Sequence, residues 1–210
     1  MAPPNRNPAL HVVYVVIISY HEFPSPPRIF SDIVIESGVI NEYIDEAWSS
    51  ASVSLLPPLN EPFNRSKARI WMDFVGKKLI PPFYRILQRQ DEPGQAEAVD
   101  ELLDGLKTFA SEMDSEGPFF LGQQLSLVDI SYIPWALRFY VLKAYRGFEL
   151  PNEGAEWERF QRWFLACQRH PSVMATVQDE DKLLHSYERY AKNNAGSQVA
   201  DAINANKPLP

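Results

Sequence analysis

The stretch Phe119–Ile130 constrains the fold most, because it predicts where a buried helix begins. Ser126 and Asp129 stand three residues apart, the spacing of a capping box, in which each residue binds a free backbone N–H at the helix start. Such a cap stabilises a helix by about 0.5–2 kcal/mol. Beyond it, apolar residues occupy nearly every face as far as Tyr140, which is typical of a helix surrounded by other helices. We therefore expect the segment 63–190 to pack as helices around this one.

Apolar residues three or four positions apart predict the helices of this segment. Pro81 and Pro82 should kink or break the first of them, and Pro134 should bend the central one, because proline lacks the N–H that a helix interior needs. The predicted helices cover, approximately, residues 63–90, 95–116, 126–142, 153–170 and 182–190.

The first part of the chain has a different pattern. β-Branched and aromatic residues at 11–18 and 33–35 predict two short strands, and apolar spacing at 37–48 predicts a helix. Prolines and serines then indicate a linker. We expect a fold of the α/β plus all-α class, divided into a small α/β domain, a linker, an all-helical domain and a disordered polar tail, at residues 1–56, 57–62, 63–190 and 191–210 respectively.

Composition excludes several classes of function. The net charge of −7 argues against a nucleic-acid partner, because phosphate binding needs a basic surface. No run approaches the roughly 18 apolar residues of a membrane span. The one cysteine of the 210 residues, Cys167, leaves no disulfide within the chain, which favours a reducing compartment such as the cytoplasm. The four histidines show no metal-binding spacing, so we predict no metal site.

Four stretches together resemble the soluble glutathione transferases, most closely their fungal omega-like branch. They are the pair Glu36–Ser37 at a strand-to-helix junction and the segments 68–74, 120–130 and 163–171. The resemblance implies a thioredoxin-like domain followed by an all-helical domain. In this chain the part that corresponds to the first domain is short, so we expect it to be truncated or divergent.

The resemblance also implies glutathione as co-substrate, with Glu36 and Ser37 binding its γ-glutamyl end. The chemistry agrees, because a helix that begins at Ser37 presents free N–H groups and a positive dipole end to a carboxylate. The Ser37 hydroxyl could donate to that carboxylate, and Glu36 could pair with the ammonium group. The alternative is an ordinary helix cap with an exposed acid beside it.

The catalytic residue stays open at this level. An omega-like member carries a catalytic cysteine after its first strand, whereas this chain has no cysteine before Cys167. Ser19 and Tyr14, with Tyr20, are the hydroxyls in that region that could hold a thiolate, and the alternative is that they pack in a strand or turn. We expect Cys167 to be buried and inert.

By the same resemblance, Trp71, Phe74 and Tyr84 would line a pocket for an apolar co-substrate, with core packing as the alternative. The chain is thus expected to conjugate or transfer glutathione to a small hydrophobic electrophile, by analogy in secondary metabolism, and to form a homodimer. A catalytically inactive binding or scaffold protein of the same fold is the alternative function. A third interpretation is that residues 1–32 derive from an alternative exon.

Overall fold

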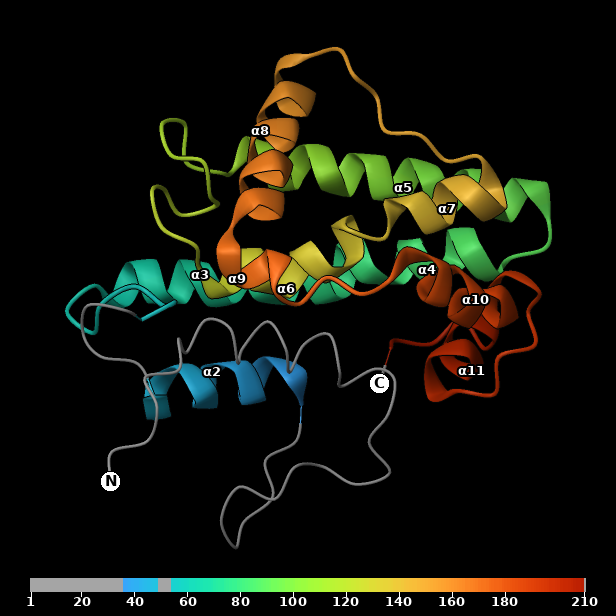
Figure 1. Ribbon diagram of the computed structural model, residues 1–210, viewed down its shortest axis with the longest axis horizontal. Coiled ribbons are helices and arrows are strands. Elements are labelled where there is room, and N and C mark those ends of the chain that lie inside the picture. The colour runs from blue at the N-terminus through green and yellow to red at the C-terminus, as the bar shows by residue number, and fades with distance from the viewer. Residues whose placement is uncertain (1–35, 49–53, 210) are drawn as a thin grey trace, which may run out of the picture. The chain divides into compact units, whose positions relative to one another are not determined.

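A computed structural model of the chain describes residues 36–48 and 54–209, and the statements below concern these residues. They form helices joined by turns (Figure 1). The described residues contain no strand, and one isolated β-bridge joins Phe119 to Gly122. The prediction of a helical segment over 63–190 is therefore confirmed, while a thioredoxin-like part is not evident. The strands predicted at 11–18 and 33–35 lie outside the described residues.

The helices have the following bounds: α2 Ser37–Trp48, α3 Pro62–Phe74, α4 Ile80–Gln88, α5 Glu92–Ser111, α6 Leu127–Ala136, α7 Phe139–Arg146, α8 Ala155–Arg169, α9 Pro171–Met174, α10 Glu180–Ala191 and α11 Gln198–Asn204. A π-helical segment, η1 Val75–Leu79, connects α3 to α4. No helix among the described residues has the length and apolar character needed to cross a membrane.

The chain forms two compact units, each assembled from several segments. The first unit runs to Met72 and adds Asp114–Pro134 and Leu165–Val177. The second unit comprises the remaining segments: Asp73–Met113, Trp135–Phe164 and Gln178–Pro210. Each of these units combines segments that are distant in sequence.

The core of the first unit forms around the start of α6. Leu127, Val128 and Ile130 are fully buried there. The loop before α6 turns back on itself so closely that a Cβ added to Gly117 would lie 2.1 Å from the backbone of Gly122. The glycine at position 117 is therefore required by the close approach of the two loop backbones.

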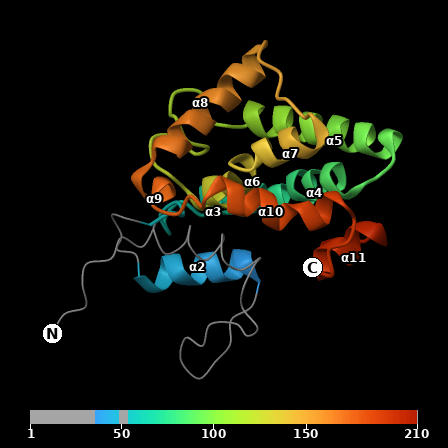
Figure 2. The same cartoon turned by 45° about the vertical axis from the view of Figure 1, so that its right-hand side comes forward.

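The second unit is built around α4, which packs against α5, α7, α10 and α11 (Figure 2). Phe83, Ile86 and Leu87 of α4 are fully buried. The Arg146 guanidinium, at the end of α7, donates hydrogen bonds to the carbonyl oxygens of Ile86, Leu87 and Ala191. It thereby satisfies carbonyls at the ends of two helices, α4 and α10, that lack partners within their own helices.

The two adjacent prolines do not end the first long helix at their own position. Instead, α3 changes into the π-helical segment η1, and α4 then begins with Pro81 in its first turn. The N–H of Ile80 donates to the Val75 carbonyl, five residues back. The wider turn precedes the prolines, which then occupy the start of a helix, where a missing N–H is tolerated.

The central helix is also divided. It ends at Ala136, two residues beyond Pro134, and α7 begins at Phe139. The Arg138 N–H donates to the Trp135 carbonyl three residues back, which closes α6 with a tighter turn. The prediction of one bent helix over 126–142 was therefore wrong in its continuity.

The prediction of a disordered tail at 191–210 was wrong, because this segment contains the helix α11. The Ser197 hydroxyl caps this helix by accepting from the Ala200 N–H at 3.2 Å, and Val199 and Ile203 are buried. Gln88 Nε2 donates to the Ala200 carbonyl at 2.9 Å. The small and polar residues of this segment suggested disorder, but they form a short amphipathic helix whose few apolar side chains pack within the second unit.

Candidate functional site

Glu36 and Ser37 stand where the sequence places them, at the start of α2. Glu36 is exposed and has a φ of 72°, in the left-handed region that residues other than glycine rarely adopt. Its carbonyl accepts from the Ile40 N–H at 2.8 Å, so Glu36 immediately precedes the first helical turn. Strained backbone of this kind is often found in ligand sites.

The N-terminus of α2 has the electrostatic character of an anion site. The helix has 12 residues and carries no acidic residue in its first turn. A Cβ added to Gly38 would meet no described atom within 4 Å, so no described residue fills the space beside this turn. The first N–H groups of a helix have no partner within it, and the helix dipole favours a negative charge beside them.

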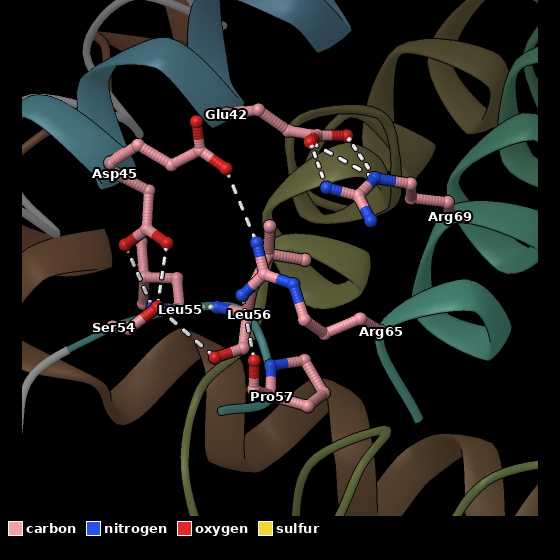
Figure 3. Close-up of polar contacts among 9 residues, drawn as sticks. Glu42, Asp45, Ser54, Leu55, Leu56, Pro57, Arg65 and Arg69 are labelled. Atoms are coloured by element: carbon pink, nitrogen blue, oxygen red, sulfur yellow. Dashed lines mark hydrogen bonds and ion pairs between the residues drawn. The ribbon is translucent and has the colours of Figure 1, made fainter. Parts of the chain in front are cut away.

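A buried carboxylate fixes the far end of α2. Asp45 is 1% exposed and accepts two hydrogen bonds of 2.8 Å, from the Leu55 N–H and the Ser54 hydroxyl (Figure 3). The Leu55 carbonyl in turn accepts from the Leu127 N–H at 2.9 Å. These bonds connect α2, through residues 54 and 55, to the start of α6.

Two arginines of α3 bind two glutamates of α2. Arg69 holds Glu42 with two N–H groups, Nη2 to Oε2 at 2.7 Å and Nε to Oε1 at 3.1 Å, and this hydrogen bonding raises the pKa of Arg69 (Figure 3). Arg65 donates to the Pro57 carbonyl at 2.7 Å and to Glu46 at 3.2 Å. We call Glu42, Asp45, Glu46, Arg65 and Arg69 the α2 clamp.

The sequence analysis did not identify this clamp, although the sequence contains its signal. Glu42 and Glu46 are four residues apart, and so are Arg65 and Arg69, which places each pair on one face of its helix. Two acids on one helix and two arginines on the next can pair in reverse order, the first acid with the second arginine and the second acid with the first arginine. The clamp fixes the direction of α2, and with it the position of Glu36 and Ser37.

The remaining predicted site residues lie in different parts of the chain. Tyr14 and Ser19 lie outside the described residues. Trp71 belongs to the first unit, where its ring centroid lies 5.4 Å from that of Phe120, whereas Phe74 and Tyr84 belong to the second unit. Tyr84 is 2% exposed. Its burial is that of a core side chain, which favours the alternative interpretation for this residue.

Asp129 binds more groups than a capping box requires. Its carboxylate is fully buried and accepts from the Ser126 N–H at 2.8 Å, the Ser126 hydroxyl at 2.6 Å and the Phe120 N–H at 2.8 Å. It therefore fixes the loop before α6 as well as the start of the helix. The role is structural, and nothing in it requires a ligand.

His170 lies between this loop and α9. Its Nδ1 accepts from the Ser172 N–H at 3.3 Å, and its ring meets Phe119 edge-on, with centroids 5.8 Å apart. Burial lowers the pKa of His170, and the charge of Asp129 opposes that shift. The neutral imidazole therefore caps α9. Cys167, on the preceding turn, is fully buried. Among the described residues, no group of three or more His, Cys, Asp or Glu side chains could hold a metal ion.

Sequence comparison identifies the helical part. Residues 92–166 match the family model described as glutathione S-transferase, C-terminal domain. Over 151 residues, 72% of this chain, the sequence is 31% identical to probable glutathione S-transferase parC of Nicotiana tabacum. It is 32% identical over 155 residues to glutathione S-transferase U22 of Arabidopsis thaliana. The aligned region spans 65% of the tobacco protein, so the chain matches about two thirds of that relative's length.

Two solved structures support the same relationship. Glutathione transferase Omega 3C from Trametes versicolor matches with a TM-score of 0.72 and 27% identity, covering 90% of this chain and 88% of that one. Rice GST1, solved in complex with glutathione, matches with a TM-score of 0.63 and 29% identity, covering 76% of this chain and 72% of that one. The two relatives named above are plant proteins, so the omega-like assignment is not confirmed, whereas the superfamily is supported.

Proposed function

Since the comparisons support placing this chain in the glutathione transferase superfamily, we propose that it binds glutathione at Glu36 and Ser37 and transfers it to a small hydrophobic electrophile. The observation that supports this most is the exposed, left-handed Glu36 at the start of α2. The α2 clamp supports it further, because buried and bidentate contacts fix the helix that carries the pair.

The two residues suit opposite charges of a γ-glutamyl group. The N–H groups at the start of α2 and the Ser37 hydroxyl can donate to its carboxylate. The Glu36 carboxylate can accept from its ammonium group. In the transfer, the glutathione thiol loses its proton and the sulfur forms a bond to an electrophilic carbon, with or without loss of a leaving group. Lowering the thiol pKa promotes this step, and the residue that does so is not assigned.

Calorimetric titration with glutathione, followed by a thiol-conjugation assay with 1-chloro-2,4-dinitrobenzene, tests the proposal. We expect Ser37→Ala to weaken glutathione binding about tenfold or more, because a hydrogen bond to a charged group contributes roughly 1.5–3 kcal/mol. Ser66→Ala is the matched control, since Ser66 is an exposed serine of α3 whose hydroxyl binds only the Pro62 carbonyl in its own helix. The control should bind glutathione like the unaltered chain.

The alternative function is a catalytically inactive binding or scaffold protein of this fold, and it is favoured by the burial of Cys167, which presents no accessible thiol to a substrate. Glutathione binding that depends on Ser37, without conjugation, would favour this alternative. Absence of binding at millimolar glutathione would contradict both the site at Glu36 and Ser37 and the transfer mechanism.

The finer assignments are also proposals. We infer an omega-like relationship from the Trametes structure and, by analogy, a substrate from secondary metabolism. A cytoplasmic location is in keeping with the single cysteine. A homodimer is supported by apolar side chains on α3, where Phe63 is 79% and Ile70 is 65% exposed.

A further inference from the structure

Arg138, in the second unit, is a buried cation for which the described residues provide no acid. It lies between α6 and α7 and is 5% exposed. Over the described ranges, no carboxylate lies within ion-pair distance of its guanidinium, and the guanidinium donates no hydrogen bond. Its Cζ lies 5.9 Å from the centroid of the Tyr187 ring. The ring supports one face of the guanidinium but cannot satisfy the five N–H donors at its edge.

Tyr140, two residues further along, also lacks a polar partner. Its hydroxyl is sealed from solvent and forms no hydrogen bond with any described group. Burial raises the pKa of Tyr140 to about 12, and the charge of Arg138 acts on the same hydroxyl in the opposite direction. A guanidinium and a phenolic O–H therefore lie within electrostatic range of each other, and neither has a hydrogen-bond acceptor among the described side chains and backbone groups. Leaving the sealed Tyr140 hydroxyl unpaired in a protein interior is costly.

The guanidinium is accessible in spite of its burial. The sealed polar atoms without partners in the described part of the chain include the Tyr140 hydroxyl but none of the Arg138 nitrogens. The edge of the guanidinium thus keeps contact with solvent while its stem is covered. Two acids at the start of α10, Asp179 and Glu180, are exposed and also raise the pKa of Tyr140. They reduce the positive potential here, so a monoanion suits the place better than a dianion such as phosphate.

We propose that Arg138 and Tyr140 bind the carboxylate of a small organic acid in the second unit. A carboxylate can accept two parallel N–H bonds from the guanidinium edge, the geometry in which arginine binds most strongly. Its second oxygen can accept from the Tyr140 hydroxyl, for which the described part of the chain provides no acceptor. This inference goes beyond the proposed function, because the site uses no residue of the glutathione site at Glu36 and Ser37.

A pair of probes that differ only in charge tests the proposal on the full-length chain. 2-Naphthoate carries the carboxylate, and 2-naphthamide has nearly the same shape without a charge. We expect tryptophan fluorescence titration to show at least tenfold tighter binding of the naphthoate. Arg138→Met should abolish this preference, and Tyr140→Phe should reduce it several-fold. Arg89→Met is the control of matched charge, because Arg89 is exposed in the same unit, and it should leave the preference unchanged.

Several results would overturn the proposal. They are equal binding of the two probes, no naphthoate binding at millimolar concentration, or an unchanged preference in Arg138→Met. If Arg138→Met does not fold, the variants Arg138→Lys and Tyr140→Phe test the proposal in its place. The lysine variant should lose most of the preference, because an ammonium group cannot donate two parallel N–H bonds to a carboxylate. The phenylalanine variant should melt no lower than the original chain, because the Tyr140 hydroxyl that it lacks has no described partner. Displacement of naphthoate by glutathione in a Ser37→Ala background would also overturn it, because the guanidinium would then hold glutathione.

Discussion

Buried polar side chains, more than apolar ones, determine where the loops of the first unit lie. Asp45 and Asp129 are at most 1% exposed, and each accepts hydrogen bonds from backbone N–H groups outside its own helix. The sequence predicted Asp129 from its spacing to Ser126, because a capping box is a local pattern. It could not predict Asp45, whose partners lie nine and ten residues away across a turn.

Replacing Asp129 by alanine should destabilise the fold rather than change a reaction. The variant leaves the N–H groups of Phe120 and Ser126 without their acceptor in a buried place, and each such group costs about 1–3 kcal/mol. Urea denaturation should therefore show a loss of roughly 2–6 kcal/mol in the free energy of unfolding. Asp100→Ala, at an exposed position of α5, should change little. An Asp129→Ala protein with an unchanged midpoint would show that the cap is dispensable.

His170 should make stability depend on pH below neutrality. Its folded-state pKa is lowered from 6.5 by burial, so the unfolded chain binds a proton more readily than the folded chain. The contribution is therefore fully present above pH 6.5 and is lost as the pH falls from there through the folded pKa. Protonation also removes the Nδ1 acceptor that caps α9.

His170→Asn keeps an N-cap acceptor that does not titrate, so its melting temperature should fall less between pH 7 and pH 5. His185→Asn is the control, because His185 is exposed on α10. Identical pH profiles for His170→Asn and the unaltered chain would exclude this role for His170.

At the scale of helices, the existence of most elements followed from apolar spacing, but their ends did not. The helix predicted at 95–116 instead spans Glu92–Ser111, because Asp91 accepts from the Gly94 N–H at 2.8 Å and begins the helix earlier. Pro171 follows the helix predicted at 153–170 and is itself the first residue of α9. Capping residues and prolines can end one helix and begin the next. The spacing of apolar residues shows neither effect, so it does not predict the exact ends of a helix.

The α11 helix offers a direct measurement at this scale. Ile203 is 4% exposed in a segment whose composition indicated disorder. Ile203→Ala should lower the free energy of unfolding by about 2 kcal/mol, the low end for a buried isoleucine, since a terminal helix can relax around the cavity. Thermal denaturation measures this loss. Asn204→Ala, at the exposed neighbouring position, should have little effect in the same experiment. Equal midpoints for the two variants would indicate that α11 contributes nothing to the fold.

At the scale of the whole chain, three helices contribute residues to both compact units. The boundary between the units falls within α3, α6 and α8. A helix cannot lose one half without exposing hydrogen-bonding groups of the other, so the units should not unfold independently. We expect circular dichroism at 222 nm and tryptophan fluorescence to report one coincident transition in urea. Two separate midpoints would contradict this coupling.

The family and the glutathione-binding role of Glu36 and Ser37 were predicted from the resemblance. Residue patterns alone would not have distinguished this pair from an ordinary helix cap. The resemblance could not predict spatial partners such as the ring beside Arg138, because Tyr187 is 49 positions away in sequence and on another helix. Local patterns indicate which residues begin and line an element. They do not indicate which charge remains without an opposite one after packing.

The π-helical segment acts as a phase shift in the long run from α3 to α4. Positions seven apart share one face of an α-helix, and Phe63, Ile70 and Lys77 are all exposed, yet the next in the series, Tyr84, is buried. The wider turn at Val75–Leu79 takes up an additional residue, and one residue corresponds to about 100° of rotation. Deleting one residue there would therefore rotate the later side chains of this helical run by about 100° about its axis, so that side chains buried in α4 would move off the buried face.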